Sequence, residues 1–165
     1  MKHRLSTTIT ILSAAILSSC ASLTTPERPA YRGADLITRA QSTQLLGKWT
    51  VNELNPHPRS EPQNTTIEYR EDGTIVGTLT PQGESAQALG NLQFAIAGEW
   101  TLDDDNVVHQ NVTMSSTSDS TMGDLISSMI NNQKGISGRA NIYELGPNRM
   151  VMVGTDGAAM EYIRQ

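Results

Sequence analysis

Residues 66–79 have the sequence TIEYREDGTIVGTL, and this stretch decides the fold. Ile67 and Tyr69 alternate with polar residues, which is the two-residue period of a strand with one buried face. Asp72-Gly73 follows, and glycine tolerates the positive φ that a tight hairpin turn needs. The stretch therefore predicts an antiparallel hairpin whose returning strand carries Ile75, Gly77 and Leu79 on one face.

Similar strand patterns lie on both sides of this hairpin, separated by short turns rich in Asp, Asn and Gly. Hairpin succession of this kind predicts an all-β protein, an up-and-down antiparallel β-barrel of about eight strands, because closure leaves no strand edge exposed. The further strands are expected at residues 47–51, 94–101, 107–114, 139–145, 150–153 and 158–163.

Three local expectations accompany the barrel. Residues 35–40 favour a short helix with Asp35 at its N-cap, and residues 81–91 are expected to form a loop. In the strand at 107–114, simple alternation places His109 on the face opposite to Val108, Val112 and Met114.

One amphipathic helix is inserted between strands, at about residues 120–133. Asp119 or Ser120 suits its N-cap, and Lys134 and Gly135 suit its C-terminal end. Two interpretations stay open: its apolar stripe packs on the barrel and completes the core, or it forms a lid over the barrel mouth or a partner surface. The stripe consists of Met122, Leu125, Ile126, Met129 and Ile130.

The N-terminus has the order of a secretory signal peptide: basic residues at 2–4, an apolar run at 9–17, then small residues. Residues 17–20, Leu-Ser-Ser-Cys, resemble the lipobox of bacterial lipoproteins. The resemblance implies cleavage between Ser19 and Cys20, and a diacylglycerol with a further acyl chain on Cys20. The alternative is a free, buried Cys20 in a soluble protein.

This resemblance divides the chain into three parts. Residues 1–19 form the signal peptide, 20–41 the lipidated cysteine and a tether with the short helix, and 42–165 the barrel domain. Ala21 follows the cysteine where an Asp would alter sorting, which implies the outer membrane, with the domain in the periplasm or at the cell surface. The membrane is then a partner through the lipid anchor.

The segment from Gly47 to Trp49 opens the first strand and resembles the Gly-x-Trp signature of lipocalins and other calycins. An Asp-Gly turn at 72–73 and a second such pair, Gly98 and Trp100, extend the likeness over residues 42–165. In lipocalins the tryptophan closes the barrel base under a basic side chain from a late strand. The resemblance implies Arg164 or Arg139 in that role, although lipocalins carry their main helix after the last barrel strand.

Charge and composition limit the kinds of partner that the protein can bind. Removing residues 1–19 leaves 10 Lys and Arg against 17 Asp and Glu, a formal charge of -7, which argues against nucleic acid as a partner. The chain has one Phe, two Trp and four Tyr, so few bulky side chains are available to fill a barrel interior. A cavity for one small ligand is therefore permitted.

Catalysis is not expected from the residue types present. His57 and His109 have no metal-ligand spacing around them, and residues 103–106 fit a solvated turn better than a calcium loop. The sequence predicts no enzyme, no metal and no cofactor. It predicts a lipoprotein whose barrel binds a small apolar or amphiphilic molecule. The alternative is a filled barrel that docks to an envelope protein assembly through its loops and the 120–133 helix.

Overall fold

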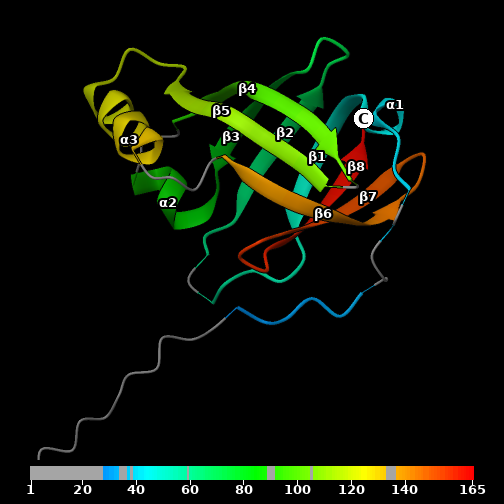
Figure 1. Cartoon of the computed structure of the whole chain (residues 1–165). Helices are drawn as coiled ribbons and strands as arrows, with labels where there is room; N and C mark the ends of the chain where they lie inside the picture. The colour runs from blue at the N-terminus through cyan, green and yellow to red at the C-terminus, as the bar shows by residue number, and fades with distance from the viewer. Residues whose placement is uncertain are drawn as a thin grey trace, which may run out of the picture.

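Eight antiparallel strands close into a barrel in the computed structural model of the chain, in up-and-down order (Figure 1). The first and last strands close it, so that Trp49 lies opposite both Ile67 and Arg164. The predicted fold class is confirmed. The strands are β1 (Gly47–Glu53), β2 (Gln63–Tyr69), β3 (Thr74–Pro81), β4 (Phe94–Asp103), β5 (Asn106–Ser116), β6 (Gly138–Leu145), β7 (Arg149–Gly154) and β8 (Ala159–Arg164).

The structure describes residues 28–33, 37, 39–58, 60–88, 92–104, 106–132 and 137–165. The predicted signal peptide, the cleavage between Ser19 and Cys20 and the lipidation of Cys20 lie outside these residues. The expected helix-capping residues Asp35, Lys134 and Gly135 lie outside them as well.

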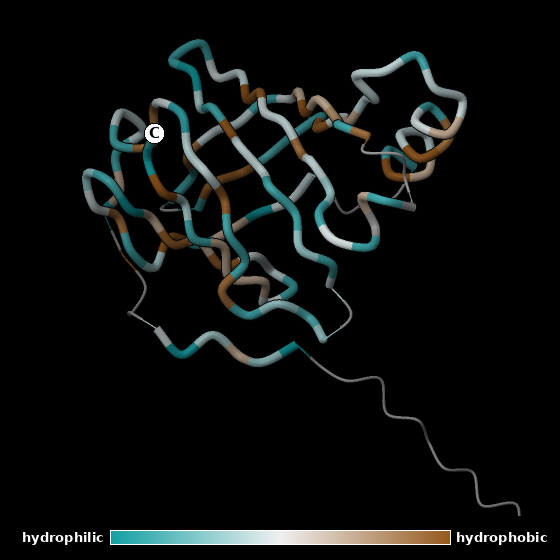
Figure 2. The backbone as a smooth tube through the Cα atoms, turned by 180° about the vertical axis from the view of Figure 1, so that it is seen from behind, coloured by the Kyte–Doolittle hydropathy of each residue, from teal (hydrophilic) through white to brown (hydrophobic). Residues whose placement is uncertain are grey.

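The hairpin predicted at 66–79 is formed by β2, β3 and the turn between them. Gly73 has φ +81°, and the Asp72 carboxylate accepts hydrogen bonds from the Thr74 N–H and hydroxyl at 2.9 and 2.6 Å. Ile67, Tyr69 and Ile75 are buried inside the barrel. Figure 2 shows the underlying pattern, with hydrophobic and hydrophilic residues alternating along the strands.

In the described part of the chain, three helices accompany the barrel: α1 (Ser42–Leu45), α2 (Gly83–Ala88) and α3 (Thr121–Asn131). The inserted helix is confirmed as α3, which lies between β5 and β6 and begins at the N-cap Ser120.

Two local predictions differ from the structure. Ile37, Arg39 and Ala40 are not helical where a helix was expected. The Ile37 N–H instead donates to the Ile142 carbonyl of β6 at 2.9 Å, so a partner from the barrel replaces the local helical bond. The 81–91 loop prediction missed α2, because the helix formers Glu84, Gln87 and Ala88 follow Gly83 there.

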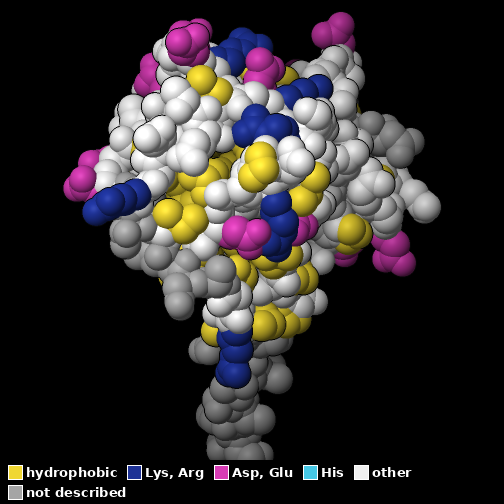
Figure 3. All heavy atoms as spheres, turned by 90° about the vertical axis from the view of Figure 1, so that its right-hand side faces the viewer, with side chains coloured by type: hydrophobic (Ala, Val, Ile, Leu, Met, Phe, Trp, Pro, Cys, Tyr) yellow, Lys and Arg dark blue, Asp and Glu magenta, His cyan; other side chains and the backbone are white. Residues whose placement is uncertain are grey.

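The strand ends define two ends of the barrel, which we call the closed end and the open end. At the closed end, where β1 begins and β8 ends, α1 lies across the barrel and Trp49 is fully buried. Its indole Nε1–H donates to the Leu45 carbonyl at 2.8 Å, and the Arg164 guanidinium lies 4.0 Å above the ring centre. Figure 3 faces this end, where side chains of both charges are interspersed with apolar atoms.

At the open end, where β1 ends and β8 begins, the sheet is incomplete between β5 and β6. These strands pair only over Asn106–His109 of β5, and α3 lies beside the rest of β5. The Asn131 side chain takes the place of the missing strand there. It accepts from the Met114 N–H and donates to the Met114 carbonyl, each at 2.8 Å.

Candidate ligand-binding site

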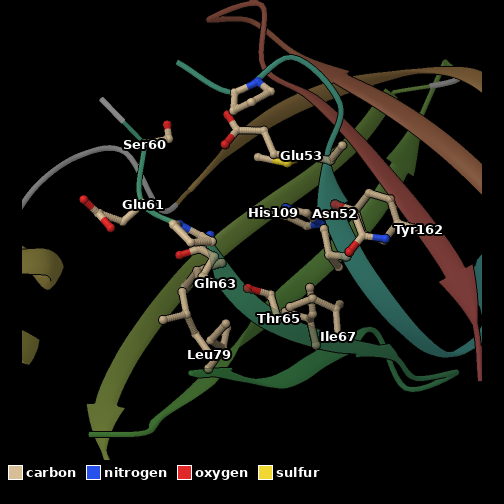
Figure 4. Close-up of a pocket in the computed structure, with 17 residues that line it drawn as sticks. Asn52, Glu53, Ser60, Glu61, Gln63, Thr65, Ile67, Leu79, His109 and Tyr162 are labelled. Atoms are coloured by element: carbon tan, nitrogen blue, oxygen red, sulfur yellow. The ribbon is translucent and has the colours of Figure 1, made fainter. Parts of the chain in front are cut away.

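A cavity of about 510 Å³ enters the barrel from the open end (Figure 4). It begins among loop and strand-end residues at the rim and reaches inner-face side chains of six strands, β1 to β5 and β8. Apolar side chains form its walls, because the strand period of two turns every second residue inward. These wall residues are Val51, Ile67, Ile75, Leu79, Ile96, Val112 and Met160.

Polar side chains meet deep in this cavity. The Tyr69 hydroxyl and His109 Nε2 are hydrogen-bonded at 2.9 Å, and the two rings stack with their centres 5.8 Å apart. Burial lowers the pKa of His109 to about 4, so its imidazole is neutral at neutral pH. Burial raises the pKa of Tyr69 and of Tyr162, and both phenols stay protonated. The inner part of the cavity is therefore polar but uncharged.

Thr65 adds a hydroxyl to the same wall. The side chain is 9% exposed and lines the cavity, next to Ile67 along β2. Its Oγ1 has no hydrogen-bond partner among the described residues. A buried hydroxyl without a partner costs about 1–3 kcal/mol, so a ligand that supplies a hydrogen-bonding atom would recover this free energy.

The charges around the cavity disfavour an anion. None of the described residues that line it is Lys or Arg. Its two ionisable carboxylates, Glu53 and Glu61, lie at the rim, and Glu53 is paired with Arg28. A carboxylate or phosphate inside would lose its hydration without gaining a cationic partner, which is costly.

A second hollow of about 380 Å³ adjoins the first. The two share His109, Met160 and Tyr162 in their linings, and the second extends toward the ends of β6 and β7. Arg139 and Asp156 line its outer part. The inner polar groups are therefore reached from two directions at the open end.

The sequence-predicted residues fall at three places. Gly47, Trp49 and Arg164 meet at the closed end, where a Cβ on Gly47 would come within 2.8 Å of the Arg164 guanidinium. Arg139 lies elsewhere, paired with Asp103 at 3.0 Å. Gly98 and Trp100 lie on β4, away from the cavity lining.

Gly98 lies where β5 bulges, and a Cβ there would be 2.9 Å from Val112 Cα. The Trp100 indole donates to the Arg70 carbonyl at 3.0 Å and packs edge-on against Tyr69. Both tryptophans are therefore part of the core rather than of the cavity wall.

The apolar stripe of α3 divides into two. Ile126 and Ile130 pack against the core, as the first interpretation expected. Met122, Leu125 and Met129 are exposed. None of the five lines the cavity.

The polar part of the cavity was not predicted from the sequence. His109 was expected on the face opposite to Val112, but both line the cavity. The reason is a bulge between Ala97 and Glu99 of β4, where β5 carries one more residue and Asn111 adopts φ +50°. The extra residue reverses the alternation beyond it. Thr65, by contrast, could have been found from its position two residues before Ile67.

Within the described residues no helix is long and apolar enough to cross a membrane, and no group of His, Cys, Asp and Glu side chains is placed to hold a metal ion.

Among known proteins, no family model matches the chain and no curated protein does. A solved structure, an NMR structure of a protein from Burkholderia xenovorans, is similar with 12% sequence identity and a TM-score of 0.40. The match covers 85% of this chain and 96% of that chain.

Proposed function

We propose that this protein is a non-catalytic, lipid-anchored lipoprotein of the bacterial outer membrane whose lipocalin-like barrel binds one small, uncharged apolar molecule. The cavity at the open end carries the proposal. Its volume of about 510 Å³ falls within the range of about 300–1,000 Å³ that ligand pockets have. A filled barrel, which the docking alternative requires, would leave no such space.

The lining suggests which molecule would fit. Apolar walls favour a hydrocarbon body. Thr65, His109 and Tyr162 offer hydrogen bonds to a hydroxyl or carbonyl group at its inner end. The absence of Lys and Arg among the described lining residues favours an uncharged ligand over a fatty acid or another anion.

The lipocalin-like class rests on the closed end. A short helix leads into the Gly-x-Trp segment, and a basic residue of the last strand covers the tryptophan. The helix inserted as α3 distinguishes this chain from lipocalins, whose main helix follows the barrel. The envelope location rests on the signal-peptide order of residues 1–19 and on the lipobox resemblance.

Native mass spectrometry tests ligand binding. The protein starting at Ala21 is produced in the periplasm, together with Leu79→Trp, which fills the cavity, and Val76→Trp, a matched change on the outer face of the same strand. We expect a discrete extra mass on the wild type and Val76→Trp, lost on organic extraction and absent from Leu79→Trp. An apoprotein mass for the wild type, or an equal extra mass on folded Leu79→Trp, would contradict the proposal.

The anchor is tested separately. Cys20→Ala in the full chain is expected to leave an unprocessed precursor that takes up no labelled palmitate. Persistent labelling in this variant would show that the acyl chain is attached elsewhere.

A further inference from the structure

Three features of the structure lie at the open end of the barrel: the cavity mouth, the exposed side of α3 and, on another side of the rim, the start of the described chain at Arg28. We propose that this end faces a lipid bilayer of zwitterionic or uncharged headgroups, with Met122, Leu125 and Met129 inserted among them. The cavity then takes its ligand directly from the membrane. The inference rests on the proposed lipid anchor at Cys20.

The first argument is the orientation of α3. Its small residues Gly123 and Ser127 are buried, and a Cβ on Gly123 would clash with the Ser116 hydroxyl of β5. This close contact fixes which side of the helix faces the barrel. Met122, Leu125 and Met129 lie on another side, 54%, 55% and 58% exposed. A helix that presents such a stripe to solvent calls for an apolar partner.

The second argument is the distribution of exposed apolar side chains. Among the described residues five large hydrophobic side chains are exposed, and four of them lie at the open end. Leu54, just beyond the end of β1, joins the three residues of α3 there. Ile163 is the one of the five that lies toward the closed end, where side chains of both charges are interspersed with apolar atoms (Figure 3). The two ends therefore differ as a membrane-facing and a solvent-facing surface would.

The third argument is the place where the tether reaches the barrel. The Asn55 amide donates to the Pro29 and Gly157 carbonyls, and Arg28 donates to the Asn55 carbonyl and pairs with Glu53. These contacts hold the chain at the open end. Beyond them it passes β6, where Tyr31 meets Tyr143, and reaches α1 at the closed end (Figure 1).

Tether length then favours one orientation. Residues 21–27 separate Cys20 from Arg28, and this length of chain spans at most about 28 Å in any conformation. To bring the closed end to the membrane, the tether would also have to cover a strand such as β1, about 23 Å for its seven residues. That distance would take up most of the maximum span, whereas an orientation with the open end at the membrane requires none of it.

The charge of the open end determines which lipid headgroups it can contact. Exposed carboxylates flank the open end at Glu61, Glu84, Asp119 and Asp124. An anionic lipid surface would repel them, so a zwitterionic or uncharged surface is the partner that fits. Three apolar side chains alone bind a membrane weakly, and the anchor supplies the second attachment that stable binding requires.

Photo-crosslinking in vesicles tests the orientation. The full chain is produced with p-benzoyl-phenylalanine in place of Leu125, purified after its Cys20 acylation has been verified by mass, and reconstituted in phosphatidylcholine vesicles. Two controls carry the same group in place of Lys48 at the closed end or Asp124 on the polar side of α3. Since all three side chains are exposed, the fold should be retained, which circular dichroism checks.

We expect a phosphatidylcholine adduct from position 125, and its loss at positions 48 and 124. Acylated, folded protein with no lipid adduct at 125, with equal adducts at 125 and 48, or with a protein adduct at 125 would overturn the inference and leave the anchor intact. Protein without acyl chains at Cys20 would overturn the anchor, and this inference with it. The ligand proposal is tested independently by the extra mass on the soluble protein.

Discussion

The Arg164 side chain ties the last strand to the segment that precedes the first one. Its guanidinium donates to three backbone carbonyls, those of Leu46, Pro147 and Gln44, at 2.6, 2.6 and 2.8 Å. It also lies over the Trp49 ring. Because the planar guanidinium points its donors in several directions at once, a single ammonium cannot reproduce this arrangement.

Arg164→Lys is therefore expected to lower the free energy of unfolding by about 2 kcal/mol, since it leaves carbonyls unpaired and weakens the cation–π contact. Urea denaturation followed by circular dichroism measures the change. The matched control is Arg139→Lys, whose exposed pair with Asp103 is worth less than about 1 kcal/mol. Equal effects of the two substitutions would show that Arg164 does not close the barrel.

A substitution at Thr65 should change stability and ligand binding in opposite directions. Thr65→Val keeps the shape of the side chain and removes the unpaired hydroxyl, so the ligand-free protein should gain about 1 kcal/mol in the free energy of unfolding. The same change should lower ligand occupancy in native mass spectrometry, because the ligand loses a hydrogen-bond partner. A valine variant that is both less stable and fully occupied would contradict this role.

The control for Thr65 is its neighbour on the outer face of β2. The hydroxyls of Thr66 and Thr78 are hydrogen-bonded to each other at 2.9 Å. Thr66→Val should therefore lose stability slightly and leave ligand occupancy unchanged.

At the scale of elements, Asn131 secures α3 against the unpaired half of β5. Its side-chain amide makes the two hydrogen bonds to Met114 that a neighbouring strand would make. An open strand edge is prone to pair with another chain, and this contact closes the edge with one residue of the helix. It also holds in place the helix whose outer side we propose to face the membrane.

Asn131→Ala should increase the hydrogen-exchange rate of the Met114 amide and lower the free energy of unfolding by about 1–2 kcal/mol. The alanine gains about 0.5 kcal/mol of helix propensity over asparagine, which the two lost bonds outweigh. Asn132→Ala, one residue later, is the control. Unchanged exchange at Met114 in Asn131→Ala would mean that α3 does not protect this edge.

The strands of the barrel and the helix α3 could be predicted from the sequence, whereas the short helices α1 and α2 could not. The β2–β3 hairpin and α3 follow from local patterns, namely alternation around Asp72-Gly73 and the apolar spacing after Ser120. The helix expected at 35–40 is wrong at its described residues, because the barrel offers Ile37 a backbone partner in β6. No local sequence pattern indicates such a tertiary contact.

The candidate site was harder to predict than the fold for a related reason. The extra residue of β5 at Asn111 is visible only once β4 is paired beside it, and it decides that His109 and Val112 both face the cavity. The split of the α3 stripe also depends on tertiary packing. The contact of Gly123 with Ser116 turns Met122, Leu125 and Met129 away from the barrel.

At the scale of the whole molecule, the tightly packed end of the barrel lies opposite to the entrance of the proposed binding cavity. Trp49, Trp100 and Arg164 close one end with packed rings and satisfied polar groups. The other end opens into a cavity with an unpaired hydroxyl at Thr65, and the neutral His109 lies at the inner part of that cavity, beside Trp100 in the sheet. An empty cavity lowers the free energy of unfolding, because contacts between packed side chains are missing there. The tight packing of the closed end compensates for this loss.

Because His109 is buried, the free energy of unfolding of the whole barrel depends on pH. Burial lowers the pKa of His109 to about 4 in the folded protein, whereas an unfolded histidine has a pKa of about 6.5. Between these values the unfolded chain binds more protons, so the free energy of unfolding contributed by His109 is fully retained above pH 6.5. It is lost as the pH falls toward 4, by about 3 kcal/mol in total.

His109→Gln tests this dependence, because glutamine can keep the hydrogen bond to the Tyr69 hydroxyl and cannot take up a proton. Tyr69 and Tyr162, which face the imidazole, have raised pKa values and do not titrate in this range. Urea unfolding of both proteins at pH 7.5, 6 and 5 isolates the histidine, since the carboxylates contribute equally to each. The difference in unfolding free energy between wild type and His109→Gln should shift against the wild type as the pH falls. A difference that stays constant with pH would mean that folding does not change the protonation of His109, as for a solvated imidazole. The inner part of the cavity would then not be the buried, uncharged surface that an apolar ligand needs.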